Sequence, residues 1–403
     1  MKIVVAGLVA ALVLAAPQAS AKEPLVPKRL LGIVGGATGA RLAKLDARTL
    51  RPISRMVDAG TGVSYVARSP GRGALVAFTG GRRGELLRFL DLDRMRWTGD
   101  MSVSGSVSAA IWRLADRLVV VTAGRASAVV IMDPAARRIR ARRNLGGTVV
   151  ATNVGADRLV AVVAPFDRIG EAWLVVVDER GRVRTVELPN VRAGTEVVST
   201  DPYVGRYERP AVAVDSRGER AVVLTARGTA VEVDLASLAT RSHTLALSRA
   251  DKGGAGSDRS ALWISPNTIA VTGSDVSEDG GETRWTPAGL KLVNVSDWSI
   301  RILETATVQM TYAWGTLLAH GGVWDAQTRR SVYPGVAGYG TDGALRFRLF
   351  EGETIGPAAI VGWHAYFTDD NATRFTIVDT NTGAVVATAE TAVPTFPLRL
   401  WLS

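Results

Sequence analysis

The segment LRFLD at residues 87–91 is an apolar run that ends in an aspartate, and this arrangement recurs along the chain. The other segments of this form are LAKLD ending at Asp46, VVIMD at Asp133, LVVVD at Asp178, VEVD at Asp234, LKLVN at Asn294, AGYGTD at Asp342 and FTIVD at Asp379. Successive marks are 45, 42, 45, 56, 60, 48 and 37 residues apart. A period of about 40–45 residues with four strands per unit is typical of a β-propeller blade.

The residue type at each mark has a local explanation. A carboxylate at the end of a strand accepts hydrogen bonds from backbone N–H groups two residues further on, and so closes a turn. Asn294 can do the same. We therefore interpret these acids as structural residues of the turn between the third and outer strands of each blade.

The repeats predict an all-β fold, a single β-propeller of four-stranded blades. The last eight residues, FPLRLWLS (396–403), form an orphan strand, and the first unit lacks an inner strand, so we expect the two ends to close the ring in one blade. Eight blades are favoured, and seven remain possible because Asp325 competes with Asp342 as a mark. The predicted blades are 29–55 with 396–403, 63–103, 107–145, 148–188, 210–247, 261–303, 308–350 and 357–390.

Some turns resemble those of known propeller repeats. ARSPGRGALVAFT (67–79) and AVDSRGERAVVLT (213–225) resemble the S-P-D-G turn of YVTN-type and TolB-like, WD40-like propellers. IVDTNTGAVVATAE (377–390) is similar to the turn shared by YVTN and PQQ-type repeats. This resemblance implies the fold and no particular ligand. The Trp that usually closes a quinoprotein repeat is absent after Asp379, which counts against a quinone cofactor. We expect no cofactor.

The first residues predict export. Met1-Lys2, an apolar run to Ala16 and an Ala-Ser-Ala ending at Ala21 form a secretory signal peptide. Residues 1–21 are thus expected to be the signal and residues 22–403 the propeller, in the periplasm or outside the cell. No later stretch reaches 18 apolar residues, so no transmembrane segment is predicted.

Composition excludes several kinds of chemistry. The chain has no Cys, which excludes disulfides, Fe–S clusters, thiolate zinc sites and cysteine nucleophiles. The net charge of +10 comes mainly from arginines spread along the chain, many at predicted turns, and such charge usually marks a solvated surface. The basic surface of an exported protein favours anionic wall polymers or lipid headgroups over nucleic acid.

Three insertions interrupt the short-loop pattern, and propeller topology places all three on one face. They run from Pro189 to Arg209, from Arg249 to Ser260 and from Gly273 to Gly289. Loops on a rigid scaffold commonly carry binding, although a plain insertion is equally compatible with the sequence. Aromatic residues beside charges suit sugars or peptides, so the predicted ligand-binding residues are Arg192, Asp201, Tyr203, Arg206, Tyr207, Arg284 and Trp285.

Other patterns carry less weight. Asp275, Glu278, Asp279 and Glu282 form a weak candidate for Ca²⁺, with a flexible acidic loop as the alternative. IVGGATGARLAKLD (33–46) resembles a dinucleotide fingerprint, but Asp46 follows its glycines too early. His243, His320 and His364 lie in different predicted blades, and no catalytic motif occurs.

The sequence thus favours an exported, monomeric, non-catalytic propeller that binds a peptide, a protein or a cell-wall glycan on its loop-rich face. The alternative is a hydrolase or lactonase with its site at the central channel. Propeller enzymes assemble sites from single residues on many blades, so the catalytic residues of that alternative stay unknown.

Overall fold

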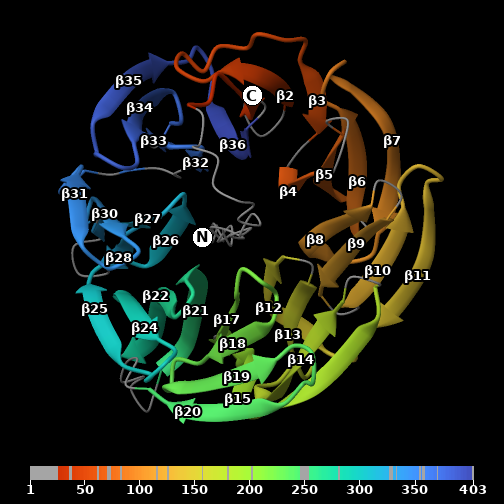
Figure 1. Cartoon of the computed structure of the whole chain (residues 1–403), viewed down its shortest axis with the longest axis vertical. Coiled ribbons are helices and arrows are strands. Elements are labelled where there is room, and N and C mark those ends of the chain that lie inside the picture. Colours follow the sequence, from red (N-terminus) through yellow and green to blue (C-terminus); the bar gives the residue numbers. More distant parts are fainter. Residues whose placement is uncertain are drawn as a thin grey trace.

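The computed structural model describes residues 26–35, 39–60, 63–69, 74–81, 84–114, 117–124, 127–156, 158–178, 181–200, 203–245, 254–279, 282–325, 330–332, 334–353, 355, 359–369 and 371–401. Within these ranges the structure consists of strands and turns, without a helix. The sheets are arranged in sequence order around a central axis (Figure 1). The prediction of an all-β propeller is confirmed.

Several blades are separate four-stranded antiparallel sheets. The first four run in the order given from the inner to the outer strand: β36 (Thr395–Trp401), β1 (Arg29–Val34), β2 (Ala40–Asp46), β3 (Val57–Gly60); β4 (Val63–Arg68), β5 (Ala74–Gly81), β6 (Gly84–Asp91), β7 (Arg96–Val103); β8 (Ser106–Leu114), β9 (Arg117–Ala123), β10 (Ala128–Asp133), β11 (Arg138–Asn144); β17 (Ala211–Val214), β18 (Arg220–Leu224), β19 (Thr229–Asp234), β20 (Thr240–Thr244).

Two further sheets of this kind complete the C-terminal part of the chain. They are β26 (Gln309–Ala313), β27 (Thr316–His320), β30 (Val336–Gly340), β31 (Leu345–Leu349), and β32 (Ala359–Val361), β33 (His364–Thr368), β34 (Arg374–Asp379), β35 (Val385–Glu390). A hairpin, β28 (Val323–Asp325) and β29 (Arg330–Val332), is inserted between β27 and β30. Asp325 therefore belongs to the hairpin, and Asp342 is the mark of its blade.

The remaining strands form one ten-stranded sheet, so the hydrogen bonding does not separate into the eight four-stranded sheets that the sequence predicts. Its order is β12 (Thr148–Gly155), β13 (Arg158–Ala164), β14 (Gly170–Val177), β15 (Val183–Thr200), β16 (Tyr203–Arg209), β21 (Gly254–Ser265), β22 (Thr268–Asp279), β24 (Leu290–Asn294) and β25 (Ile300–Glu304), with β23 (Glu282–Pro287) paired to β22. The reason is the 18-residue length of β15, whose second half extends beyond its own blade and pairs with β16. Because β16 also pairs with β21, the hydrogen bonding runs on into the blade that contains β21.

The aspartate marks close turns as predicted. The Asp234 carboxylate accepts hydrogen bonds from the N–H groups of Ala236 and Ser237, at 3.0 and 2.7 Å. Asn294 accepts from the N–H of Ser296 at 3.0 Å. Six of the eight marks accept from the N–H two residues further on, as predicted: Asp46, Asp91, Asp234, Asn294, Asp342 and Asp379. The other two differ: the Asp133 carboxylate accepts from the N–H of Ala136, and that of Asp178 from the N–H of Arg182.

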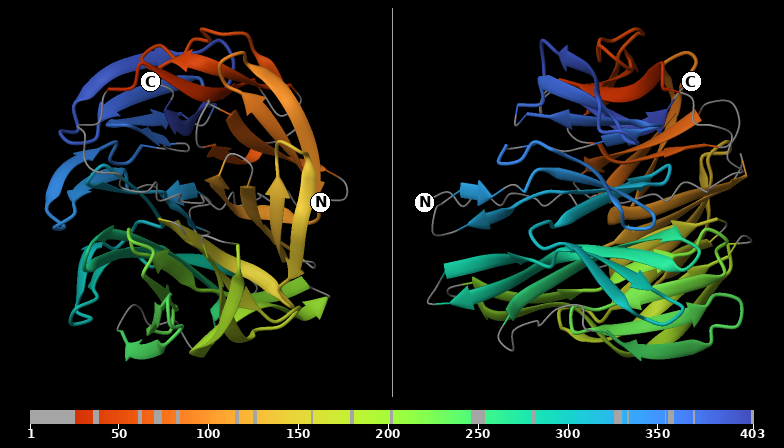
Figure 2. Two further views of the ribbon diagram at one scale, coloured as in Figure 1. Left: turned by 45° about the vertical axis from the view of Figure 1, so that its right-hand side comes forward. Right: turned by 60° about the vertical axis from the view of Figure 1, so that its left-hand side comes forward.

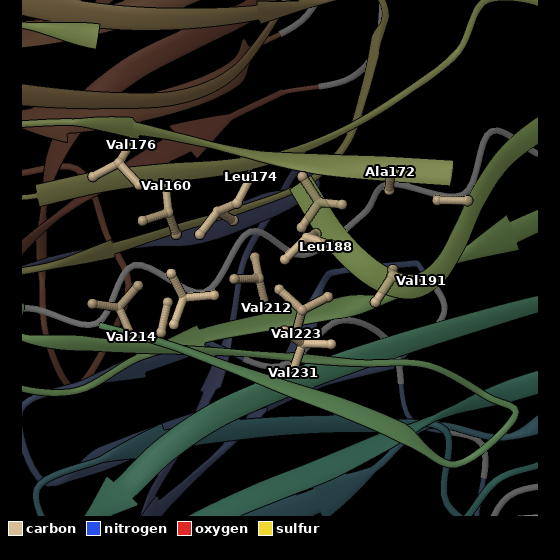
Figure 3. Packing of buried hydrophobic residues seen from close by; sticks show 14 of the residues in the cluster. Val160, Ala172, Leu174, Val176, Leu188, Val191, Val212, Val214, Val223 and Val231 are labelled. Carbon is tan, nitrogen blue, oxygen red and sulfur yellow. The ribbon is translucent and has the colours of Figure 1, made fainter. Parts of the chain in front are cut away.

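The hydrophobic core lies between neighbouring sheets. Figure 3 shows one such cluster, in which Val160 and Leu174 of the β12–β15 region face Val212 and Val223 of the β17–β20 sheet. These side chains are completely or almost completely buried. Because burying one such side chain contributes about 1.5–3 kcal/mol, apolar packing between sheets supplies most of the stability in a chain without disulfides.

Many arginines at the surface also link neighbouring sheets, which the sequence did not indicate. Arg88 of β6 donates to the carbonyl of Asp58 in β3 at 2.9 Å, and Arg143 of β11 donates to that of Val183 in β15 at 2.7 Å. Arg301 of β25 donates to the carbonyl of Asp342, in the turn before β31, at 2.9 Å. A guanidinium has several donors in a planar fork, which suits it to exposed carbonyls on an adjacent sheet.

Candidate ligand-binding arm

The three insertions meet in one small sheet that continues outward from the ring. We call this sheet the arm; it comprises residues 194–200, 203–209, 254–260, 272–279 and 282–287. β15 and β16 pair antiparallel, β16 pairs parallel with β21, and β22 pairs with both β21 and β23. The strands of this region extend beyond the body of the ring in the side view (Figure 2, right).

Two glycines allow the strands to pass from the ring into the arm. At Gly194 (φ 128°) an added Cβ atom would lie 2.2 Å from the carbonyl oxygen of Arg168. At Gly273 (φ 149°) it would lie 1.9 Å from the carbonyl oxygen of Asp258. Only glycine tolerates such a backbone and such a close approach. Beyond Gly273, β22 exchanges its blade partner β24 for the arm strand β23.

A buried arginine holds the base of the arm. The Arg259 side chain is 1% exposed and pairs with the Asp275 carboxylate at 2.7 Å. Its Nη1 donates to the carbonyls of Asp258 and Ser274, both at 2.9 Å. Burial lowers the pKa of the nearby Lys291, and the charge of Arg259 lowers it further. A buried charge with hydrogen bonds to both strands fixes β21 and β22 relative to each other.

A second ion pair ties the arm to the neighbouring blade. Glu208 of β16 pairs with Arg227, in the turn between β18 and β19, at 2.5 Å. Glu208 and Ser257 are aligned in the parallel pair, and Ser257 is aligned with Asp275, so these residues share the face of the arm that carries Arg259. The charged anchors therefore lie on one face, and we call the other the aromatic face.

The aromatic face carries a row of residues aligned across four strands. Tyr207 of β16 is aligned with Gly256 of β21, Gly256 with Val276 of β22, and Val276 with Trp285 of β23. Aligned residues point to the same side of a sheet. Tyr207 and Trp285 are half-buried, while Val276 is buried. The strand β23 lies beside β28 of the inserted hairpin.

Charged groups surround the Tyr207 ring. The guanidinium of Arg209 lies 5.0 Å from the ring centroid and its Nη1 is 3.8 Å from the Asp258 carboxylate. Burial raises the pKa of Tyr207 to about 12, and the charge of Asp258 adds to this. Burial also raises the pKa of Asp258, which Arg209 only partly offsets. Perturbed ionisable groups gathered at one place are characteristic of functional sites.

The structure brings together only some of the predicted ligand-binding residues. Tyr207 and Trp285 share the aromatic face, whereas Arg206 and Arg284 are exposed and adjoin them in sequence, so they point to the opposite face. Arg192 lies before the bend at Gly194, opposite Glu171 of β14. Asp201 and the side chain of Tyr203 lie outside the described residues.

The calcium candidate has one described member. Asp275 is engaged by Arg259 rather than turned toward a cation, and the side chains of Glu278, Asp279 and Glu282 lie outside the described part. Among the described residues no group of His, Asp or Glu side chains is arranged to hold a metal ion. The described residues also contain no helix long and apolar enough to cross a membrane.

Sequence reasoning missed Asp258, Arg259 and Lys291. Asp258-Arg259 lies inside the second insertion, and a charged pair just before the apolar run ALWIS was an available signal. Lys291 was not singled out because it lies within the repeat segment LKLVN, whose pattern is that of an ordinary blade strand. Their proximity depends on the pairing of β16, β21, β22 and β24, which no local sequence pattern indicates.

Comparison with solved structures finds β-propellers. AztD from Citrobacter koseri has a TM-score of 0.55 and 11% identity, covering 92% of this chain and 96% of that one. The dihydro-heme d1 dehydrogenase NirN, in complex with DHE, has a TM-score of 0.55 and 14% identity, covering 95% and 78%. Sqt1 from Saccharomyces cerevisiae has a TM-score of 0.52 and 11% identity, covering 90% and 88%.

The likeness is one of fold. At such identities a shared propeller says nothing about a shared ligand. No protein-family model and no curated protein sequence matches the chain. What the propeller binds must therefore be argued from its own residues.

Proposed function

We propose that the chain is a non-catalytic binding propeller and that its ligand contacts the aromatic face of the arm. The ligand classes that fit are a peptide, a protein segment or a cell-wall glycan. The predicted signal sequence supports action in the periplasm or outside the cell, after cleavage near Ala21. We further propose a monomer whose ring has eight blades, with β36 as the closing strand.

The observation that carries this proposal is the aligned row from Tyr207 to Trp285 on a sheet that the ring itself does not require. Two half-buried aromatic side chains stand on a surface that Arg259 and Glu208 hold in place. Large aromatic groups on a rigid, preorganised support contribute binding energy with little loss of conformational entropy. A merely tolerated insertion would not need a buried arginine paired with a carboxylate at its base.

The test is a thermal-shift screen of residues 22–403 against peptides, wall glycans and lactones. A ligand that binds only the folded state, at 100 times its Kd, adds about 2.7 kcal/mol of stability and raises the Tm. We expect Trp285→Ala to abolish the Tm increase. The matched control is Trp314→Ala, because Trp314 is 46% exposed in the turn between β26 and β27. Loss of the ligand-induced Tm increase in both variants, or in neither variant, contradicts the proposal.

The alternative is an enzyme. NirN is named a dehydrogenase, so a propeller of this general shape accommodates catalysis in that protein. In this chain the raised pKa of Asp258 would suit a general acid, which is the specific feature in favour of that reading. Turnover of a glycan or lactone by the purified protein, lost in Asp258→Asn, would support the alternative over simple binding.

A further inference from the structure

Asp258 is a half-buried carboxylate on the aromatic face that accepts a hydrogen bond from the backbone N–H of Arg259. Its side chain is 31% exposed, and the Arg209 Nη1 atom lies 3.8 Å away, beyond hydrogen-bond length. The neighbouring Arg259 directs its guanidinium to backbone carbonyls and Asp275. Asp258 is aligned with Arg209 of β16 on one side and with Ser274 of β22 on the other.

Arg209 and Asp258 together present a donor and an acceptor of opposite charge to the same face. Because the two charges compensate each other, a ligand with a net charge gains little from the pair. A ligand whose hydroxyl groups donate to the carboxylate and accept from the guanidinium satisfies both. The hydroxyl group of Ser274, half-buried in the same row, adds a further hydrogen-bonding group of either kind.

The aromatic row lies directly beside the Arg209–Asp258 pair, because its members on β16 and β21 are two residues from Arg209 and Asp258 along those strands. Tyr207 covers Gly256, where the absence of a side chain gives its ring room. Tyr207 and Trp285 are three strand spacings apart, about 14 Å at about 4.8 Å per spacing. A ligand that contacts both rings is therefore longer than a single small ring and presents apolar C–H faces at both ends.

We propose that the aromatic face binds an uncharged glycan chain, with sugar C–H faces against Tyr207 and Trp285 and sugar hydroxyl groups on Asp258 and Arg209. This inference rests on the proposed function and narrows its ligand to one class. A peptide would need its backbone N–H and C=O groups satisfied along the contact. Between its two rings the aromatic row has only Gly256, which lies under the Tyr207 ring, and the buried Val276, and neither residue has a side chain that can form hydrogen bonds with a peptide backbone.

The experiment is calorimetric titration of residues 22–403 with three hexasaccharides, of β-1,4-linked N-acetylglucosamine, β-1,4-linked glucose and β-1,3-linked glucose. We expect one of them to bind, and Asp258→Asn to weaken it at least about tenfold, because a site built to pair with hydroxyl groups discriminates strongly when one partner is changed. Trp285→Ala is expected to weaken it similarly. Tyr207→Phe, which keeps the ring over Gly256, should retain most of the affinity.

Two control variants test whether glycan binding depends on the aromatic face in particular. Arg206→Ala lies on the opposite face of the arm and should bind the hexasaccharide as the wild type does. Trp314→Ala should do the same. The melting temperature of each variant, measured first, identifies any that fail to fold. If Asp258→Asn is one of them, Trp285→Ala carries the test of lost binding, with Tyr207→Phe as the folded variant that should still bind.

The outcomes distinguish this inference from the function on which it rests. Absence of binding by all three hexasaccharides, with a peptide that binds and depends on Trp285, overturns the glycan assignment and leaves the binding arm intact. Hexasaccharide binding that persists in Asp258→Asn and Trp285→Ala places the glycan elsewhere and also overturns it. If neither glycans nor peptides depend on the arm, both proposals fail.

Discussion

Tyr207 of β16 lies over Gly256 of β21, so closely that a Cβ atom at position 256 would be 2.3 Å from Cε1 of the tyrosine ring. The contact joins a strand that enters from one blade to a strand that belongs to another. It also sets the ring on the same face as Val276 and Trp285. The aromatic face is thus built by a pairing between segments about fifty residues apart in the sequence.

Gly256→Ala is expected to displace the Tyr207 ring and to destabilise the protein by about 1–3 kcal/mol, the usual cost of an overpacked contact. Urea unfolding measures this change. Gly39→Ala is the control, because no heavy atom lies within 4 Å of an added Cβ there. In a Tyr207→Ala background the cost at Gly256 should fall sharply, and an undiminished cost would refute the contact.

Arg259→Met is expected to destabilise the protein by about 3–5 kcal/mol, because it leaves Asp275 and two carbonyl groups without their buried partner. Arg206→Met, whose side chain is exposed although it lies on the same face of the arm as Arg259, should change the free energy of unfolding by less than about 0.5 kcal/mol. Similar effects of the two substitutions would mean that Arg259 does not anchor the arm.

Asp258 makes a specific pH dependence. Burial raises its pKa in the folded state above the unfolded value, so between these values the folded state binds more protons and stability increases as the pH falls. Asp258→Asn removes this dependence. We therefore expect the variant to be more stable than the wild type at pH 7, with the difference shrinking toward pH 4. If the stability difference between the variant and the wild type grew as the pH fell, the pKa of Asp258 would be lowered in the folded state, which contradicts its burial.

His364 has the opposite dependence on pH. It is buried, and burial lowers its pKa despite the nearby Asp379. The unfolded state then takes up a proton near pH 6.5 before the folded state does, so stability falls as the pH drops below that value. The stability of His364→Leu, followed by urea unfolding from pH 8 to pH 5, should fall less than that of the wild type. Parallel curves would show that His364 does not titrate differently in the two states.

The repeat aspartates give a test of the fold itself. Asp234→Ala removes an acceptor of two backbone N–H groups and the Ser237 hydroxyl, and should cost about 1 kcal/mol or more. Asp234→Asn should keep most of the stability that Asp234→Ala loses, because Asn294 accepts the same kind of hydrogen bond in another blade. The free energies of unfolding of the two variants test whether the Asp234 side chain closes the turn. Equal losses of stability in both variants would contradict that role.

Much of the ring could be predicted from the sequence because its determinants are local. The predicted blade 63–103 coincides with β4 to β7, and the aspartate turns follow from side-chain chemistry within a few residues. The outermost strand of the first blade was placed too early, because the chain continues past Arg55 before β3 begins at Val57.

The arm was less accessible to such reasoning. Residues 189–209 and 273–289 read as loops, yet they continue existing strands past Gly194 and Gly273. Their partner strands come from distant parts of the chain, and the parallel pairing of Tyr207 with Gly256 has no local signature. Asp258 could not be recognised because its importance lies in which residues surround it.

Hydrogen exchange tests the central claim, binding at the aromatic face, most directly. Residues 22–403 would be exchanged with and without the compound that raises the Tm most in the thermal-shift screen. We predict added protection in residues 203–209, 254–260 and 272–287, with the other blades unchanged. Protection on the inner strands of several blades, with these segments unaffected, would contradict the account and place the ligand at the central channel.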